Sequence, residues 1–191
     1  DETILGNVCQ PADAGNIARV VALRSGIPES KPAVTVHRNC ASGFESLTTA
    51  YEKMAADRGE VFVVGGTENM SQVPLLYRFA AAAKFTALAR AKTAGQRLAA
   101  MARFRPADFS PVIGLKLGLT DPVVSLSMGE TAELLAREFE LSREEQDEFA
   151  LKSHQKAALA GDRLQQEIAP VFQAHASVHV DNGVRERQSM E

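Results

Sequence analysis

The feature that most constrains the fold of this chain is a strand, a helix and a second strand that follow one another along residues 33–64. Residues 33–37 (AVTVH) are a short β-branched run, and residues 61–64 (VFVV) are a continuous apolar run of the buried-strand type. Between them, from Ala41 onward, apolar residues recur at the spacing of an α-helix. A unit of this kind pairs its strands in parallel through a right-handed crossover, so we expect an α/β fold with helices between parallel strands.

The residues before this unit add a further strand and helix. Residues 3–8 predict an opening strand, and residues 11–15 predict a loop. A helix is expected from Ile17, and Gly26 ends it. The N-terminal part of the chain is therefore rich in strands.

Helical signals dominate the rest of the chain. Residues 78–105 hold eleven alanines and seven basic residues, and alanine has the highest helix propensity. Capping boxes at residues 127–130 (SMGE) and 142–145 (SREE) predict two more helices. We therefore divide the chain into residues 1–73, part of a core domain, and residues 74–191, an inserted helical region.

The composition excludes several classes of protein. The sequence holds 24 acidic and 21 basic residues, 45% of it is hydrophobic, and its formal net charge is −3. These values exclude a disordered tail, a collagen-like repeat and a generally basic nucleic-acid binder. No run of about eighteen uncharged apolar residues occurs, so no membrane-spanning helix is expected. We expect a soluble protein with no nucleic-acid partner.

The cysteines and the chain ends indicate the cellular compartment and the extent of the chain. Two cysteines are too few for a disulfide framework, which indicates a reducing compartment, and we expect the cytoplasm. The first residues lack the basic start and the apolar stretch of a signal peptide. The chain begins without Met and stops at Glu191 without an obvious terminal element, so we expect both ends to be cuts through a longer polypeptide.

Cys40 stands at the turn between the first strand of the unit and its helix. A thiol at a helix N-terminus meets unsatisfied backbone N–H groups and the positive end of the helix dipole, which favour the thiolate. The small residues Ala41, Ser42 and Gly43 leave room for a substrate to approach the sulfur. A buried structural cysteine is the alternative, and Cys9, which has no such setting, is assigned a structural role. Position alone thus makes Cys40 a candidate nucleophile.

Four segments of the sequence resemble those of the thiolases, which cleave and condense 3-ketoacyl-CoA thioesters. They keep the order and spacing of that family, and together they cover nearly the whole chain. The segments are residues 36–43 (VHRNCASG), 65–71 (GGTENMS), 128–133 (MGETAE) and 142–150 (SREEQDEFA). The related ketosynthases share the cysteine turn but not the Met-Ser or Arg-Glu-Glu-Gln-Asp segments. The resemblance implies a share of the layered α-β-α-β-α thiolase fold, namely part of its N-terminal half and its helical loop insertion.

The resemblance implies that Cys40 is the nucleophile of an acyltransferase. Its sulfur would attack the 3-keto carbon, acetyl-CoA would leave, and the shortened acyl chain would stay on the sulfur until free CoA accepts it. Coenzyme A is then a substrate, and no cofactor is bound permanently. The activating histidine and the second cysteine of the family lie in C-terminal motifs that do not occur in this sequence. We therefore expect the chain alone not to thiolyse 3-ketoacyl-CoA.

Three segments narrow the resemblance to the thiolase subunit of the fatty-acid oxidation trifunctional complexes. They are residues 77–105, with GQRL at 95–98, residues 152–154 (KSH) and residues 181–185 (DNGVR). This implies cleavage of 3-ketoacyl-CoA in fatty-acid β-oxidation, by a homodimer or higher oligomer with a hydratase/dehydrogenase partner subunit. Two alternatives stay open: an acetoacetyl-CoA-forming thiolase (acetyl-CoA C-acetyltransferase), and a non-catalytic fragment that binds acyl-CoA or scaffolds a complex.

The resemblance also assigns contacts with acyl-CoA and CoA to the helical region. Met128 matches a family methionine near the pantetheine, although a core methionine at a helix start is the alternative. Ser127 stands where many members carry a histidine, which puts that contact in doubt. Glu68 is expected at a dimer interface or in the active-site wall, with a structural pairing as the equal alternative.

The histidines do not supply the missing base. His37 lies on the strand before the nucleophile, and solvated or structural roles are expected for the other three. No group of cysteines and histidines has the spacing of zinc ligands, and the glycines after the second strand lack the pattern of a nucleotide-binding loop. The other three histidines are His154, His175 and His179. We therefore expect no metal site.

The basic segment, residues 78–105, predicts a contact surface. It carries seven positive charges and no acid, although the whole chain has a net charge of −3. Such local asymmetry is typical of a surface that meets anionic lipid, a partner subunit or CoA phosphates. The resemblance to the trifunctional subunit favours peripheral membrane contact or a partner, and a solvated alanine-rich helix is the alternative.

Overall fold

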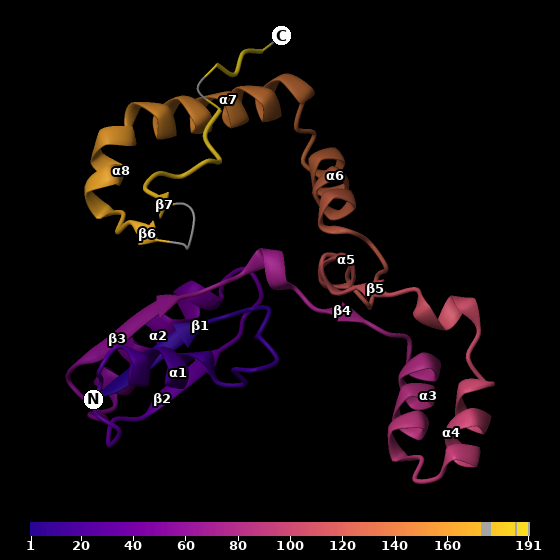
Figure 1. Ribbon diagram of the computed structural model, residues 1–191. Coiled ribbons are helices and arrows are strands. Elements are labelled where there is room, and N and C mark those ends of the chain that lie inside the picture. The colour runs from indigo at the N-terminus through magenta and orange to yellow at the C-terminus, as the bar shows by residue number, and fades with distance from the viewer. Residues whose placement is uncertain (173–176, 186, 191) are drawn as a thin grey trace. The chain divides into compact units, whose positions relative to one another are not determined.

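The computed structural model describes residues 1–172, 177–185 and 187–190 of the chain. The chain divides into two compact units, Asp1–Thr120 and Asp121–Glu191 (Figure 1). Of the helices in the described residues, none is both long enough and apolar enough to cross a membrane.

A three-stranded parallel sheet forms the centre of the first unit. Its strands are β1 (Glu2–Gly6), β2 (Ala33–Val36) and β3 (Phe62–Gly66). They lie in the order β2-β1-β3, and Ile4 of β1 is aligned with Val34 on one side and Val64 on the other. The parallel pairing confirms the predicted α/β class. The two strands of the predicted unit do not pair with each other, because β1 lies between them and pairs with both.

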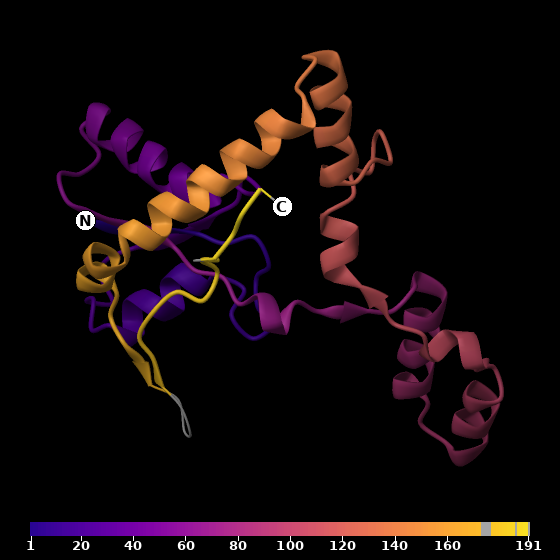
Figure 2. The same ribbon diagram turned by 90° about the horizontal axis from the view of Figure 1, so that it is seen from above.

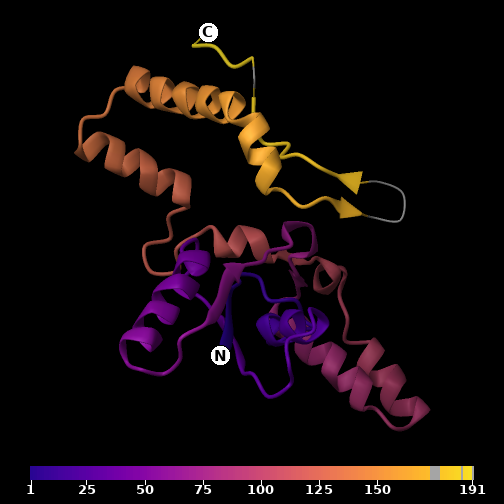
Figure 3. The same ribbon diagram turned by 90° about the vertical axis from the view of Figure 1, so that its left-hand side faces the viewer.

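Two helices cover the two faces of this sheet. They are α1 (Ile17–Arg24) and α2 (Ser42–Ala55). The crossover from β1 to β2 and the crossover from β2 to β3 run in opposite directions across the sheet, so right-handed connections place their helices on opposite faces. Figures 2 and 3 show the strands between the two helices. Ile4 and Ser46 have no exposed surface, and the rest of the core is largely alanine.

Small residues of α2 face the sheet, and large apolar residues face away from it. Ser42, Ser46 and Ala50 are the buried residues of α2. The periodic apolar residues that predict this helix are instead exposed, in a stripe along its outer side. The stripe consists of Phe44 (68% exposed), Leu47 (51%), Tyr51 (73%) and Met54 (48%). The small residues allow the helix and the sheet to approach each other closely.

Helices and a short ladder make up residues 70–120. The elements are η1 (Met70–Gln72), β4 (Leu75–Leu76), α3 (Phe79–Arg90), α4 (Ala94–Met101), η2 (Pro106–Phe109), β5 (Val112–Ile113) and α5 (Gly114–Gly118). The predicted helical character of residues 78–105 is confirmed, with a break before Thr93, which caps α4 in a capping box with Gln96. Lys84 and Asp108 pair at 2.6 Å. Next to this pair, four rings contact one another: Tyr77, Phe85, Phe104 and Phe109.

The second unit is mainly helical. Its elements are α6 (Met128–Glu138), α7 (Arg143–Leu159), α8 (Gly161–Glu167), β6 (Val171–Phe172) and β7 (Ser177–Val178). Both predicted capping boxes are present, with Ser127 before α6 and Ser142 before α7. The two short strands pair antiparallel.

Candidate active site

Cys40 lies on the short connection between β2 and α2, residues 37–41, which we call the elbow. Asn39, directly before the cysteine, has a φ of 47°, a left-handed conformation that residues other than glycine seldom adopt. The cysteine itself is exposed. It therefore lies between a strand and a helix, as the sequence predicts, although β2 ends at Val36 rather than His37.

Side chains from both ends of the elbow hold its shape. The Ser42 hydroxyl accepts a hydrogen bond from the Arg38 backbone N–H at 2.8 Å and donates one to the Asn39 carbonyl at 2.6 Å. Ser42 is only 3% exposed, so these contacts are shielded from water. The Arg38 guanidinium forms a two-pronged pair with Glu45 in the first turn of α2, at 2.8 and 3.0 Å. Residues before Cys40 are thus joined by these contacts to residues after it.

Glycine at the end of β1 lets α2 begin very close to the sheet. A Cβ atom at Gly6 would lie 2.1 Å from the Ser42 carbonyl oxygen and 2.6 Å from the Gly43 nitrogen. Both are backbone atoms, so no side-chain rotation relieves the clash. A Cβ atom at Gly66, at the end of β3, would lie 3.4 Å from the Gly43 Cα. The carboxyl ends of two strands therefore lie directly against the N-terminus of α2.

The first turn of α2 presents free donors beside the thiol. Ser42 N–H and Glu45 N–H bond to carbonyls of the elbow. Gly43 N–H and Phe44 N–H have no acceptor among the described residues, as is usual in the first turn of a helix. Free N–H groups at the positive end of a helix favour an anion, either a thiolate or an oxyanion that develops on a substrate.

A depression of about 260 Å³ lies at this point, which we call the nucleophile depression. Its lining includes Asn7, Val8, Cys40, Gly43, Gly66 and Glu68. No histidine is among the described residues that line it. The site therefore combines an exposed thiol, helix N–H groups and one carboxylate, which is the equipment of a nucleophile without its base.

The two residues predicted to contact CoA belong to the second unit. Ser127 caps α6: its hydroxyl accepts from Glu130 N–H at 3.2 Å, and its own N–H donates to the Glu130 carboxylate at 2.7 Å. That backbone bond holds the pKa of Glu130 below its ordinary value. Met128 opens α6 and is 47% exposed. Their contact with CoA stays a prediction.

The histidines and Cys9 lie in ordinary surroundings. His37 Nδ1 accepts from Asn39 N–H at 3.3 Å, and His154 Nδ1 accepts from Arg185 N–H at 3.2 Å. His179 contacts the Ser177 hydroxyl, and His175 lies outside the described residues. Cys9 is half-buried, and its backbone N–H donates to Glu68. Within the described part of the chain, no three potential ligands are placed to hold a metal ion.

The sequence interpretation missed Gly6 and Asn7. Both follow from topology: because the carboxyl ends of parallel strands meet at one edge of a sheet, residues after β1 had to lie near those after β3. The order β2-β1-β3 brings Asn7 beside Glu68, some sixty residues away along the chain. The glycine at the end of the predicted opening strand was the available signal.

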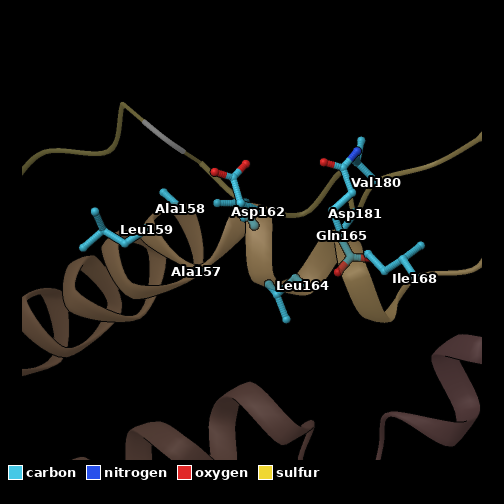
Figure 4. Close-up of a pocket in the computed structure, with 11 residues that line it drawn as sticks. Ala157, Ala158, Leu159, Asp162, Leu164, Gln165, Ile168, Val180 and Asp181 are labelled. Carbon is cyan, nitrogen blue, oxygen red and sulfur yellow. The ribbon is translucent and has the colours of Figure 1, made fainter.

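A second hollow, of about 370 Å³, lies in the second unit at the corner between α7 and α8 (Figure 4). Its lining is largely aliphatic, with Asp162, Gln165 and Asp181 as its polar members. None of its lining residues is a cysteine or a histidine. It offers no thiol, so the nucleophile depression, which holds Cys40, is the candidate active site.

Comparison with known proteins places these features in a family context. The family model described as the N-terminal domain of thiolase matches residues 1–191. A probable acetyl-CoA acyltransferase of Staphylococcus aureus (strain COL) is 37% identical over the whole chain, which covers 46% of that protein. The β subunit of the mitochondrial trifunctional enzyme of Bos taurus is 36% identical over 97% of the chain and 39% of that protein.

The comparison with solved structures agrees with the comparison of sequences. The crystal structure of human mitochondrial 3-ketoacyl-CoA thiolase in complex with CoA is similar with a TM-score of 0.78 and 34% identity. The similarity covers 99% of this chain and 44% of that one. The chain thus spans less than half the length of the proteins that it resembles.

Proposed function

Because the chain belongs to the thiolase family, we propose that Cys40 is the acyl-accepting nucleophile of a 3-ketoacyl-CoA thiolase. The observation that carries the proposal is the setting of Cys40: an exposed thiol in a depression, at the N-terminus of α2, beside two N–H groups without acceptors. The chain therefore contains the nucleophile and the N–H donors of the proposed reaction. The full-length protein would supply the base and the second proton donor.

The reaction would proceed by two acyl transfers. In the first, the Cys40 thiolate attacks the 3-keto carbon of the substrate, the bond between C2 and C3 breaks, and the C2 carbanion takes a proton to leave as acetyl-CoA. In the second, the thiolate of free CoA attacks the acyl-cysteine, which releases the shortened acyl-CoA and restores Cys40. The free N–H groups of Gly43 and Phe44, in the first turn of the helix that follows Cys40, would stabilise negative charge near the sulfur.

The finer assignments rest on the relatives. Similarity to a trifunctional-enzyme β subunit supports cleavage of 3-ketoacyl-CoA in fatty-acid oxidation, and a partner subunit that carries the hydratase and dehydrogenase steps. Similarity to the CoA complex of a human thiolase supports CoA as substrate. The proposal includes a homodimer or higher oligomer in the cytoplasm. Acetoacetyl-CoA formation is the alternative reaction.

Steady-state kinetics of the full-length protein test the proposal. Wild type should release acetyl-CoA from 3-ketoacyl-CoA and free CoA, with higher kcat/KM for long chains than for acetoacetyl-CoA. Cys40→Ser should abolish turnover while CoA binding stays near wild type, and Cys9→Ser should keep turnover. A preference for acetoacetyl-CoA would favour the alternative reaction. CoA binding without turnover in the wild type would favour a non-catalytic acyl-CoA-binding protein.

A further inference from the structure

Glu68 fastens the segment after β3 to the segment after β1. One carboxylate oxygen accepts a hydrogen bond from Val8 N–H at 2.8 Å. The other accepts from Cys9 N–H at 3.1 Å and from the Asn7 side-chain amide at 3.3 Å. Both oxygens are therefore used, and both oxygens act only as acceptors. Such bonds from N–H groups to a carboxylate are stronger than bonds between neutral groups.

Asn7 is held in one orientation by acceptors alone. Its amide nitrogen donates to the Thr67 carbonyl at 2.6 Å as well as to Glu68. Because neither partner can donate, the amide cannot turn over without losing both bonds. Asn7 is 3% exposed, and its side-chain oxygen has no hydrogen-bond partner among the described residues.

One atom of this arrangement, the Asn7 side-chain oxygen, departs from stable packing. A buried polar atom without a partner is destabilising, and such atoms are rare in native proteins. Glu68 forms no ion pair with a basic side chain in the described part of the chain, so its charge is offset by N–H groups alone. Departures of this kind from stable packing are expected at functional sites.

Asn7 and Glu68 also line the nucleophile depression together with Cys40. The other walls of the depression come from the strand ends, the elbow and the α2 N-terminus, where Gly6 and Gly66 pack closely against α2. Asn7 and Val8 form the remaining wall. This wall is held by the bond from Asn7 N–H to the Val36 carbonyl at 3.1 Å and by the contacts with Glu68 and Thr67.

We propose that Asn7 and Glu68 are a positioning pair for acyl transfer at Cys40. They hold residues 7–9 in place, so that Asn7 and Val8 form a fixed wall against which a thioester lies when its carbonyl carbon meets the Cys40 sulfur. Neither residue touches the reacting atoms, and neither is assigned a proton-transfer step. The inference rests on the proposed function, because it concerns the same nucleophile.

If Asn7 and Glu68 act in this way, Glu68→Gln should impair acyl transfer to Cys40. Glutamine has the size of glutamate, but one of its two terminal groups is a donor. That group must face either Val8 N–H or the donors of Cys9 and Asn7, and two donors repel. Residues 7–9 therefore move, while the thiol, the elbow and α2 keep their own contacts.

The experiment compares two reactions of Cys40 in the full-length protein. Iodoacetamide needs an available thiolate, whereas acetyl-CoA must also be seated correctly, so the ratio of acetylation to alkylation measures positioning. Both rates at Cys40 are followed by peptide mass mapping. The variants are Glu68→Gln and Asn7→Leu, and the matched control is Glu52→Gln on the exposed side of α2. Asn7→Leu fits the buried position and leaves the two backbone contacts of Glu68 in place.

Glu68→Gln should lower the acetylation-to-alkylation ratio by ~10–100-fold, because a displacement on the order of 1 Å has effects of that size. Asn7→Leu should lower it less, and the control should match wild type. A purely structural role would instead lower the melting temperature and expose Cys9 to iodoacetamide at an unchanged ratio. Wild-type ratios in both variants would overturn the inference alone. No acetylation of Cys40 in the wild type would overturn the proposed function and this inference with it.

Discussion

Gly6→Ala should detach the N-terminus of α2 from the sheet. The added Cβ atom would lie 2.1 Å from the Ser42 carbonyl oxygen and 2.2 Å from its carbonyl carbon. Ordinary contacts between non-bonded heavy atoms are ~3.5–4.0 Å, so the two backbones must separate by more than about 1 Å. Because the obstructing atoms are backbone, the whole first turn of α2 has to move, and the elbow moves with it.

The energetic cost follows from the kind of clash. Overpacking that side chains can absorb costs about 1–3 kcal/mol, and a clash with backbone belongs at the upper end of that range. We therefore expect the free energy of unfolding of the first unit to fall by about 3 kcal/mol. With a urea dependence of about 2 kcal/mol per molar, the midpoint should fall by about 1.5 M.

The assay is urea unfolding followed by circular dichroism, with iodoacetamide labelling of Cys40 on the folded protein. Gly65→Ala is the matched control, because its Cβ atom would lie 3.6 Å from a Leu5 methyl carbon, an ordinary contact. The control should stay within about 0.5 kcal/mol of wild type. A Gly6→Ala variant with the midpoint and the labelling rate of wild type would refute the close packing described for the elbow.

Three further predictions concern the remaining elements. Lys84 and the Arg105 backbone N–H hold the pKa of Asp108 below its ordinary value of 3.8. The ionised Asp108 therefore stabilises the fold fully above that pH, and this contribution is lost as the pH falls below it. The fall in urea midpoint between pH 7 and pH 3 should be smaller in Asp108→Asn than in wild type, and an equal fall would contradict this. Ser142→Ala removes the cap of α7 and should lower the free energy of unfolding of the second unit by about 1 kcal/mol in urea titrations. The basic segment, residues 78–105, should make the chain sediment with vesicles that contain anionic lipid, and equal sedimentation of a neutralised variant, or none by either protein, would remove the membrane interpretation. The neutralised variant carries glutamine in place of Arg90, Lys92, Arg97 and Arg103.

Much of the fold was predictable because it depends on local patterns. Apolar runs identified the strands of the parallel sheet but not the short strands β4 to β7. The capping boxes at Ser127 and Ser142 identified where α6 and α7 begin. The position of β1 was not predictable in this way. Its pairing with both β2 and β3 depends on contacts between residues far apart in sequence, and periodicity carries no information about strand order.

The outward stripe of α2 shows the limit of hydrophobic patterning. Periodicity identifies which residues share a helix face, but it does not say which face meets the sheet. Here the decisive factor is size, because Gly6 allows a separation at which only the small residues Ser42 and Ser46 fit. The large residues, such as Phe44, are left on the outer face.

The same distinction between local and long-range features applies to the candidate site. Cys40 was predictable because a strand-to-helix turn is a local feature. The contacts of Glu68 with Asn7, Val8 and Cys9 join residues some sixty positions apart, and they exist only because β1 and β3 are neighbours. From the sequence, Glu68 had two equal interpretations; the structure shows it paired with these N–H groups and also lining the nucleophile depression.

The central claim is that Cys40 receives the acyl group, and trapping that intermediate tests it most directly. The full-length protein is mixed with 3-ketoacyl-CoA in the absence of free CoA, quenched in acid and digested, and the peptides are mapped by mass. The account predicts an acyl group on the Cys40 peptide that is shorter than the substrate chain by one acetyl unit, and none on the Cys9 peptide. An acyl group on Cys9, or an unmodified Cys40 while acetyl-CoA is released, would contradict it.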